Sequence, residues 1–170
     1  SDEIRDIYIT RWVDNEWTTP KPVYADGWKI AGCPVNGPSM AAHGNHLAVA
    51  WFSAKDNQPQ VKLAISEDGG ENFAPPIMIA NGDTNGRVSL AITDSGKIAV
   101  SWLHVAGSDA ELKLSLFDAS GELLETSTIA RTKSSRRSGF PVITAQNNTL
   151  YVSWTDISEG SSVKIARVKL

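Results

Sequence analysis

The sequence repeats itself with a period of about 50 residues, and a period of that length restricts the chain to a small set of repeat folds. Three segments align without a gap, and each ends in a tryptophan: residues 37–51, 88–102 and 140–154. A second related stretch, rich in aliphatic residues, follows each of them after nine or ten residues: 61–66, 112–117 and 163–168. The chain is therefore built from one unit used several times.

Within each unit, apolar residues alternate with polar ones, which is the pattern of β-strands that bury one face. The turns "HGNH", "DSGK" and "QNNT" interrupt this alternation and predict tight hairpins. We expect four antiparallel strands per unit, named A to D, and no long helix. In the first complete unit they should span roughly 38–43, 46–53, 60–66 and 76–80. Four strands repeating at this period predict an all-β fold made of β-propeller blades.

The phase of the repeat shows where the chain enters and leaves this pattern. Residues 5–24 align with strands C and D of one blade, 38–80 and 88–130 form two full blades, and 140–170 supply strands A to C of a further blade. That makes about three blades, whereas propellers close with about four to eight. We therefore expect part of a propeller, most simply a six-bladed one. Its partner would be either the remaining half of a longer protein or a second copy of this chain.

The turn between strands C and D of the first full blade carries a specific motif. "SEDGGENF" contains Ser66, Asp68, Gly70 and Phe73 in the order S-x-D-x-G-x-x-F. This resembles the Asp box of the sialidase-like (BNR-repeat) propellers. The resemblance implies a structural role, in which the aspartate caps turn amides, the glycine takes a conformation closed to other residues, and the aromatic ring plugs the blade edge.

The other blades keep only traces of this motif. Asp14 and Trp17 remain in the first blade, and Asp118 and Gly121 in the third. The stretches "GCPVNGP", "NGRVSL" and "RRSGFP" also resemble a group of exported bacterial sialidase-like proteins. That resemblance implies that the chain is the C-terminal half of such a protein and that it acts in the periplasm or outside the cell.

A ligand site is expected on the face of the propeller that carries the D–A and B–C loops. The three D–A loops, 25–37, 81–87 and 131–139, bring five basic residues toward one rim: Arg87, Arg131, Lys133, Arg136 and Arg137. Because arginine pairs well with carboxylates, this rim favours an anionic ligand.

The sialidase resemblance implies three arginines that hold a sugar carboxylate, a Tyr–Glu nucleophile and an aspartate as acid/base. Arg87, at the start of strand A, is the best candidate for one of these arginines, and Arg137 is a second. Asn36 fills the position equivalent to Arg87 in the preceding blade, whereas Gly139 fills it in the following one. The alternative is that these arginines are solvated loop charges or form ion pairs between blades.

Catalytic residues are harder to assign. Asp156 and His104 occupy equivalent positions two residues after a repeated tryptophan, and Tyr24 ends a D strand near the site face. No glutamate partner for a tyrosine stands out, and such residues often only solvate a loop. Trp28, in the longest D–A loop, is a candidate for stacking on a sugar ring or for packing beneath its own loop.

Composition and residue spacing argue against several other classes of function. A formal charge of −3 gives no reason to expect nucleic acid, and no apolar run reaches membrane-spanning length. The single cysteine, Cys33, suits a buried thiol or a disulfide to a missing half better than a nucleophile. His43 and His46 lack further ligands in register, so we expect neither a metal site nor a cofactor.

Two functional hypotheses remain. The first is a sialidase-like propeller that binds an acidic carbohydrate, such as a sialylated glycan, in its funnel, with glycoside hydrolysis depending on residues of a missing half. The second is a non-catalytic propeller that acts as a structural or protein-interaction scaffold.

Overall fold

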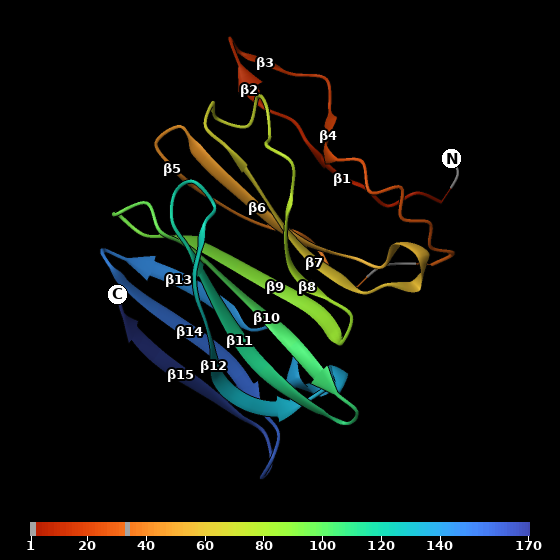
Figure 1. Ribbon diagram of the computed structural model, residues 1–170, viewed down its shortest axis with the longest axis vertical. Helices are drawn as coiled ribbons and strands as arrows, with labels where there is room; N and C mark the ends of the chain where they lie inside the picture. Colours follow the sequence, from red (N-terminus) through yellow and green to blue (C-terminus); the bar gives the residue numbers. More distant parts are fainter. Residues whose placement is uncertain (1–2, 33–34) are drawn as a thin grey trace.

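The computed structural model describes residues 3–32 and 35–170, and its regular structure is almost entirely β (Figure 1). Two four-stranded antiparallel sheets form its centre. Blade 2 contains β5 (Ser39–His43), β6 (His46–Ser53), β7 (Gln60–Ser66) and β8 (Ile77–Asn81). Blade 3 contains β9 (Thr84–Ile92), β10 (Ile98–Ala106), β11 (Asp109–Phe117) and β12 (Leu123–Lys133). In each sheet the strands pair in sequence order, which confirms the expected all-β fold of propeller blades.

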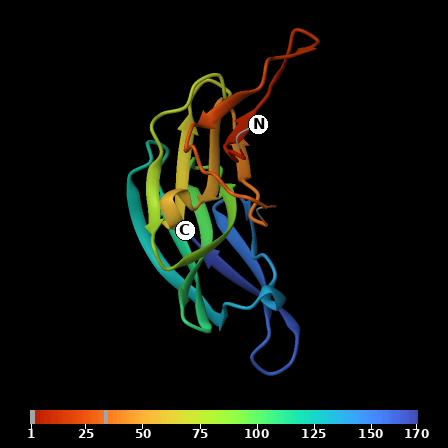
Figure 2. The same cartoon turned by 90° about the vertical axis from the view of Figure 1, so that its right-hand side faces the viewer.

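Smaller sheets flank these two. Blade 4 contains β13 (Val142–Gln146), β14 (Thr149–Asp156) and β15 (Ser162–Lys169). Blade 1 is a pair of short strands, β1 (Ile7–Ile9) and β4 (Lys21–Tyr24). Between them the hairpin of β2 (Trp12–Val13) and β3 (Glu16–Trp17) projects from the molecule, as Figure 2 shows. Two single 3-10 turns, η1 (Lys55–Asn57) and η2 (Arg136–Ser138), lie in loops.

The strands follow the sequence pattern, with two differences at the D–A loops. Blade 3 was expected to end at residue 130, but β12 continues to Lys133. Strand A of blade 3 was expected from residue 88, but β9 begins at Thr84. The Thr84 hydroxyl donates to the carbonyl of Leu103 at 2.8 Å, and β9 continues through an irregularity in which Gly86 and Arg87 both have positive φ angles. The loop expected over 81–87 is therefore mostly strand, which places Arg87 inside a sheet.

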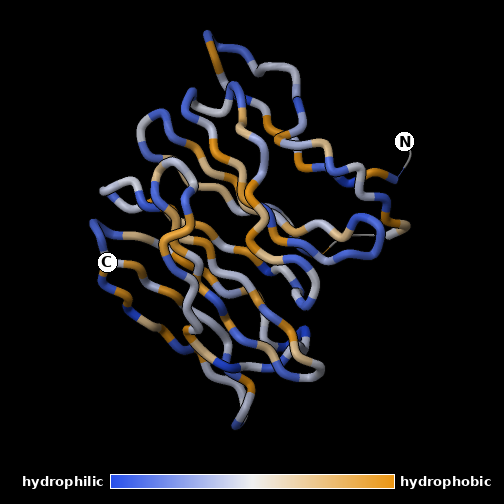
Figure 3. Tube along the Cα trace, in the orientation of Figure 1, coloured by the Kyte–Doolittle hydropathy of each residue, from blue (hydrophilic) through white to orange (hydrophobic). Residues whose placement is uncertain are grey.

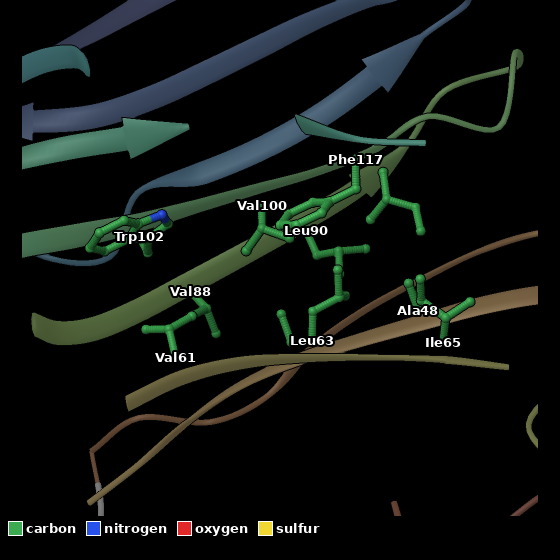
Figure 4. Close-up of a cluster of buried hydrophobic side chains, with 11 residues drawn as sticks. Ala48, Val61, Leu63, Ile65, Val88, Leu90, Val100, Trp102 and Phe117 are labelled. Atoms are coloured by element: carbon green, nitrogen blue, oxygen red, sulfur yellow. The ribbon is translucent and has the colours of Figure 1, made fainter. Parts of the chain in front are cut away.

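Successive blades pack face to face through apolar side chains. Figure 4 shows the contact between blades 2 and 3, where Val61, Leu63 and Ile65 of β7 meet Val88 and Leu90 of β9 and their neighbours on β10. A second cluster joins blade 3 to blade 4, and a third joins blade 1 to blade 2. The hydrophobic segments accordingly run along the interior strands in Figure 3. Each fully buried Val or Leu stabilises the fold by roughly 1.5–3 kcal/mol.

Strand A of blade 2 bonds to strand A of blade 3, and strand A of blade 3 bonds to strand A of blade 4. The Ser39 hydroxyl on β5 accepts a hydrogen bond from the Leu90 amide on β9, at 2.9 Å. The Ser89 hydroxyl on β9 accepts one from the Ile143 amide on β13, at 3.0 Å. Because these innermost strands lie side by side, the loops that lead into them gather on one side of the molecule.

Side-chain hydrogen bonds hold the turn after β7. The Asp68 carboxylate accepts hydrogen bonds from the Asn72 amide and side chain, while the Ser66 hydroxyl accepts one from the Gly70 amide at 2.9 Å. The two bonds from Asn72, and after them the bond that the Ser66 hydroxyl donates to Asp68, hold the pKa of Asp68 well below its usual range. Phe73 packs against the cluster between blades 1 and 2.

Glycines in these turns leave space that side chains from other strands occupy. Gly70 has φ +83°, and a β-carbon there would lie 2.8 Å from Leu47 and 3.0 Å from Ile9 of blade 1. In the next blade, a β-carbon on Gly121 would lie 2.5 Å from Ile77 of blade 2. The neighbouring Asp118 accepts bonds from Ser120 and Glu122, and the Ser120 hydroxyl bond is the main reason why its pKa is lowered.

Candidate functional site

The three D–A loops meet around a hollow of about 320 Å³ on the side where the innermost strands begin. Each loop contributes to its lining, which we call the funnel hollow: Val35, Asn36, Asn85, Arg87, Ser134, Arg136 and Phe140. Blades 2 to 4 are thus all represented at this site. The sequence brought Asn36 and Arg87 to equivalent positions, and the structure brings them into contact, because the Asn36 side-chain oxygen accepts from the Arg87 amide at 2.9 Å.

Arg87 connects blade 3 to the loop that enters blade 4. Its guanidinium donates to the Ser138 hydroxyl and the Gly139 carbonyl, both at 2.8 Å, and to the Ser135 carbonyl at 3.1 Å. It also lies over the ring of Phe140, 5.7 Å from the centroid. These contacts hold the η2 turn, so Arg87 is not a solvated charge, and it forms no ion pair with any residue that the structure describes.

The charged side chains that line the funnel hollow are positive. Arg87 is buried, and burial lowers its pKa from the ordinary arginine value. Within residues 3–32 and 35–170, no carboxylate lies within ion-pair distance of Arg87 or Arg136. Three of the five guanidinium N–H groups of Arg87 have acceptors, all of them neutral. The hollow therefore presents positive charge that the surrounding protein does not neutralise.

Two of the expected ligand-binding residues lie elsewhere. Arg136, not Arg137, lines the funnel hollow. Arg137 is exposed on η2, where its amide donates to the Ser135 hydroxyl. Trp28 is buried and packs edge-on against Phe52 with ring centroids 5.7 Å apart, which corresponds to packing rather than to an open stacking platform. Cys33 lies outside the described residues.

A larger hollow of about 490 Å³, which we call the outer hollow, lies beside β10, β11 and β12 of blade 3. The remaining two basic residues of the expected rim line this hollow. Arg131 and Lys133 line it together with their partners Glu111 and Asp109. The hydrogen bond from Lys113 is the main reason why the pKa of Glu111 is lowered. The basic rim is thus divided, and only Arg87 and Arg136 reach the funnel hollow.

The three catalytic candidates are not brought together. His104 lines the outer hollow. Asp156 is buried, accepts from the Ser158 amide and hydroxyl, and pairs with Lys164, the main reason why its pKa is lowered. Tyr24 lies in blade 1, where its ring contacts the ammonium group of Lys62. Asp156 therefore stays ionised, which suits a structural anion better than a proton donor.

Sequence reasoning missed a buried polar cluster between blades 1 and 2. The carboxylate of Asp26 pairs with the ammonium group of Lys62 and accepts from the Trp51 indole N–H at 2.6 Å. All three side chains are buried. A signal was present, because a lysine faces the repeated tryptophan across a strand pair in blades 2, 3 and 4: Trp51 with Lys62, Trp102 with Lys113, and Trp154 with Lys164.

Among the described residues, no three His, Cys, Asp or Glu side chains gather as metal ligands would. His43 and His46 face each other across the β5–β6 hairpin. Nor does the described part of the chain contain a helix with the length and apolarity needed to span a bilayer.

Comparison with known proteins gives similarity in fold only. The sequence matches no protein-family model and no curated protein. Among solved structures, it is similar to a GH43_12 protein retrieved from a capybara gut metagenome, with a TM-score of 0.52, 13% identity, and coverage of 77% of this chain and 28% of that one. It is also similar to a thermostable family-43 glycoside hydrolase, with a TM-score of 0.52, 12% identity, and coverage of 79% and 50%.

The chain spans half or less of the length of these two proteins. Neither is a sialidase by name, so the sialidase resemblance and the six-blade count stay predictions. At such low identity the likeness carries no residue roles. What the comparison shows is that this chain has the fold of β-propeller blades.

Proposed function

We propose that this chain forms part of a propeller funnel that binds an acidic carbohydrate. The observation that carries the proposal is the funnel hollow, where Arg87 and Arg136 have no carboxylate at ion-pair distance among the described residues. Concentrated positive charge attracts anions, and arginine matches the planar geometry of a carboxylate. A sugar acid, including a sialylated glycan, has both the charge and the hydroxyl groups that such a site would bind.

In this proposal, different residues of the funnel hollow bind different groups of the ligand. Arg136 is exposed and supplies the accessible cation, while Arg87 holds the η2 turn that carries Arg136. The amides of Asn36 and Asn85 offer donors and acceptors for sugar hydroxyls. Phe140, 46% exposed, offers an apolar surface for the face of a sugar ring.

The resemblance of the Ser66–Phe73 turn to the Asp box, and the fold shared with glycoside hydrolases, support a carbohydrate over other anions. On the same resemblance we propose an exported location. Glycoside hydrolysis usually needs two carboxyl groups about 5–10 Å apart, and the seven lining residues include none. We therefore propose binding, with hydrolysis dependent on residues from another half. The dispersal of Tyr24, His104 and Asp156 favours the second candidate, a non-catalytic scaffold.

Isothermal titration calorimetry with 3′-sialyllactose and lactose tests the proposal. The acidic sugar should bind and lactose should not, because only the former has a carboxylate for the arginines. Arg136→Gln should weaken binding at least tenfold, a change equal to about 1.4 kcal/mol.

The adjacent arginine provides a matched control. Arg137→Gln removes the same charge from the same turn, but at a residue that does not line the hollow, so affinity should change less than twofold. Equal binding of both sugars, or a larger loss at Arg137 than at Arg136, would contradict the proposed site. Binding of neither sugar would favour the scaffold.

A further inference from the structure

Three Asn–Gly pairs occur in the segments that lead into strands A of blades 2 and 3: residues 36–37, 81–82 and 85–86. An Asn–Gly pair is chemically labile, because the glycine amide nitrogen can attack the side-chain carbonyl carbon of the asparagine and no β-carbon hinders its approach. The reaction needs a glycine amide that is free of other bonds and a backbone that can rearrange. The local structure therefore decides which of the three pairs can react.

Two of the pairs are protected by hydrogen bonds to their glycine amides. The Gly82 amide donates to the carbonyl of Pro59 at 2.8 Å. The Gly86 amide is buried within β9 and donates to the Thr84 hydroxyl at 3.0 Å. In both pairs the attacking nitrogen is held in place, so reaction requires the local structure to open first.

The pair Asn36–Gly37 lacks this protection. Both residues precede β5 and lie outside every strand and 3-10 turn, and Gly37 is exposed. The Gly37 amide donates to none of the residues that the structure describes. Its nitrogen is therefore open to solvent bases, and its backbone is not fixed by a sheet.

The contact with Arg87 also activates the Asn36 side chain. The Asn36 Oδ1 atom accepts a hydrogen bond from the Arg87 amide at 2.9 Å. When the Gly37 nitrogen attacks Cγ of Asn36, negative charge develops on this same oxygen. A backbone donor that is already in place stabilises that charge, as the donors of an oxyanion hole do.

We propose that Asn36 deamidates spontaneously and so places a carboxylate in the funnel hollow. The Gly37 nitrogen, after giving its proton to a solvent base, forms a bond to Cγ of Asn36. The Cγ–Nδ2 bond then breaks, and the nitrogen leaves as ammonia after taking up a proton. Water opens the resulting succinimide at either carbonyl carbon, which leaves an aspartate or an isoaspartate. The net reaction converts an amide and a water molecule into a carboxylate and ammonium.

The consequence of this reaction for binding rests on the proposed function. Asn36 lines the funnel hollow together with Arg87 and Arg136, and none of the lining residues is acidic. A carboxylate at Asn36 offsets part of the positive charge that would attract an anionic sugar. The affinity for such a ligand should therefore fall as the protein ages, and it should fall faster at alkaline pH, where the Gly37 amide loses its proton more often.

Peptide mapping by mass spectrometry, on the 170-residue protein kept in mildly alkaline buffer, tests the modification without any ligand. The tryptic peptide 30–55 contains Asn36, and the peptide 63–87 contains both protected pairs, so one sample reports all three. Asn36 should convert at least about tenfold faster than Asn81 or Asn85, which react only when the local structure opens. In urea the three rates should become similar. An unchanged Asn36, or equal rates in the folded protein, would overturn the proposal.

Two variants connect the modification to binding. Gly37→Ala should suppress the conversion and keep the fold, because its methyl group obstructs the attack while a β-carbon there has no atom within 4 Å. Asn36→Asp reproduces one product and should weaken binding of 3′-sialyllactose roughly tenfold. Asn45→Asp, which adds the same charge at the β5–β6 turn, is the matched control and should leave the affinity unchanged.

Calorimetry on fresh and aged samples distinguishes the possible failures. Aged wild-type protein should bind 3′-sialyllactose more weakly than fresh protein, and aged Gly37→Ala should not. An aged sample that is modified at Asn36 but binds as the fresh one does would refute the effect on the funnel hollow. If fresh protein binds no acidic sugar, the proposed function is wrong, whereas the peptide masses still decide whether Asn36 is modified.

Discussion

Replacing Asp26 by Asn should destabilise the protein more than almost any other single polar substitution. Asn keeps an oxygen that can accept from the Trp51 indole, so the change removes mainly the negative charge. Lys62 is then left as a buried ammonium group, 8% exposed, without its anion. Breaking a buried ion pair by removing one partner costs about 3–5 kcal/mol.

That loss is large compared with a total folding stability of about 5–15 kcal/mol. For a domain of this size it corresponds to a fall in Tm of roughly 6–20 °C. Urea denaturation followed by tryptophan fluorescence measures it directly, since Trp51 lies in the cluster. The double variant Asp26→Asn, Lys62→Met removes both charges and should recover most of the stability.

Two results would refute this reasoning. A loss below about 1 kcal/mol in Asp26→Asn would mean that the pair behaves like an exposed salt bridge. A double variant no more stable than Asp26→Asn would mean that the unpaired ammonium of Lys62 is not the source of the loss.

Three further predictions concern packing and pH. Gly86→Ala should cost about 1–3 kcal/mol, because Gly86 has φ +67° and a β-carbon would lie 2.7 Å from Cβ of Phe52; Gly37→Ala, with no atom within 4 Å, should be nearly neutral in the same urea titration. Leu114→Ala, at a residue 1% exposed, should cost about 2–5 kcal/mol, whereas Leu123→Ala, 55% exposed, should change the urea midpoint little. Because the pKa of Asp68 is lowered in the folded state, its stabilising effect is present above its ordinary value of 3.8 and is lost as pH falls below it. Between pH 5 and about 2.5, Tm should therefore fall less in Asp68→Asn than in the wild type, and an identical fall in both would contradict the assignment.

The fold could be predicted because the alternation of apolar residues and the turn residues report local structure. Strands β6 and β7 occupy the ranges expected from that alternation, and Gly44, Gly96 and Asn147 supply positive φ angles at the three hairpin turns. Period-two patterns fix which face of a strand is buried, and that is sufficient for blades that pack face to face.

The site could be predicted only in outline, because its loops do not repeat. The sequence placed Arg87 and Asn36 near one another, since both were expected to lie just before a strand A, and the structure brings them into contact although Arg87 lies within β9. It could not choose between Arg136 and Arg137, because the conformation of η2 decides which side chain enters the funnel hollow. The repeated tryptophan–lysine pairs could have indicated Lys62, but its partner Asp26 is 36 residues away and no local pattern indicates that aspartate.

The contacts made by Gly70 and Gly121 bear on how such a chain could have grown by duplication. Each glycine accommodates an isoleucine of the blade before it, Ile9 for Gly70 and Ile77 for Gly121. A copied blade therefore fits only if the glycine of one copy and the isoleucine of its predecessor are inherited together. The unit that must be inherited intact is therefore the boundary between two blades. Chimaeras in which the two parent sequences join inside a sheet should be better tolerated than chimaeras in which they join between sheets.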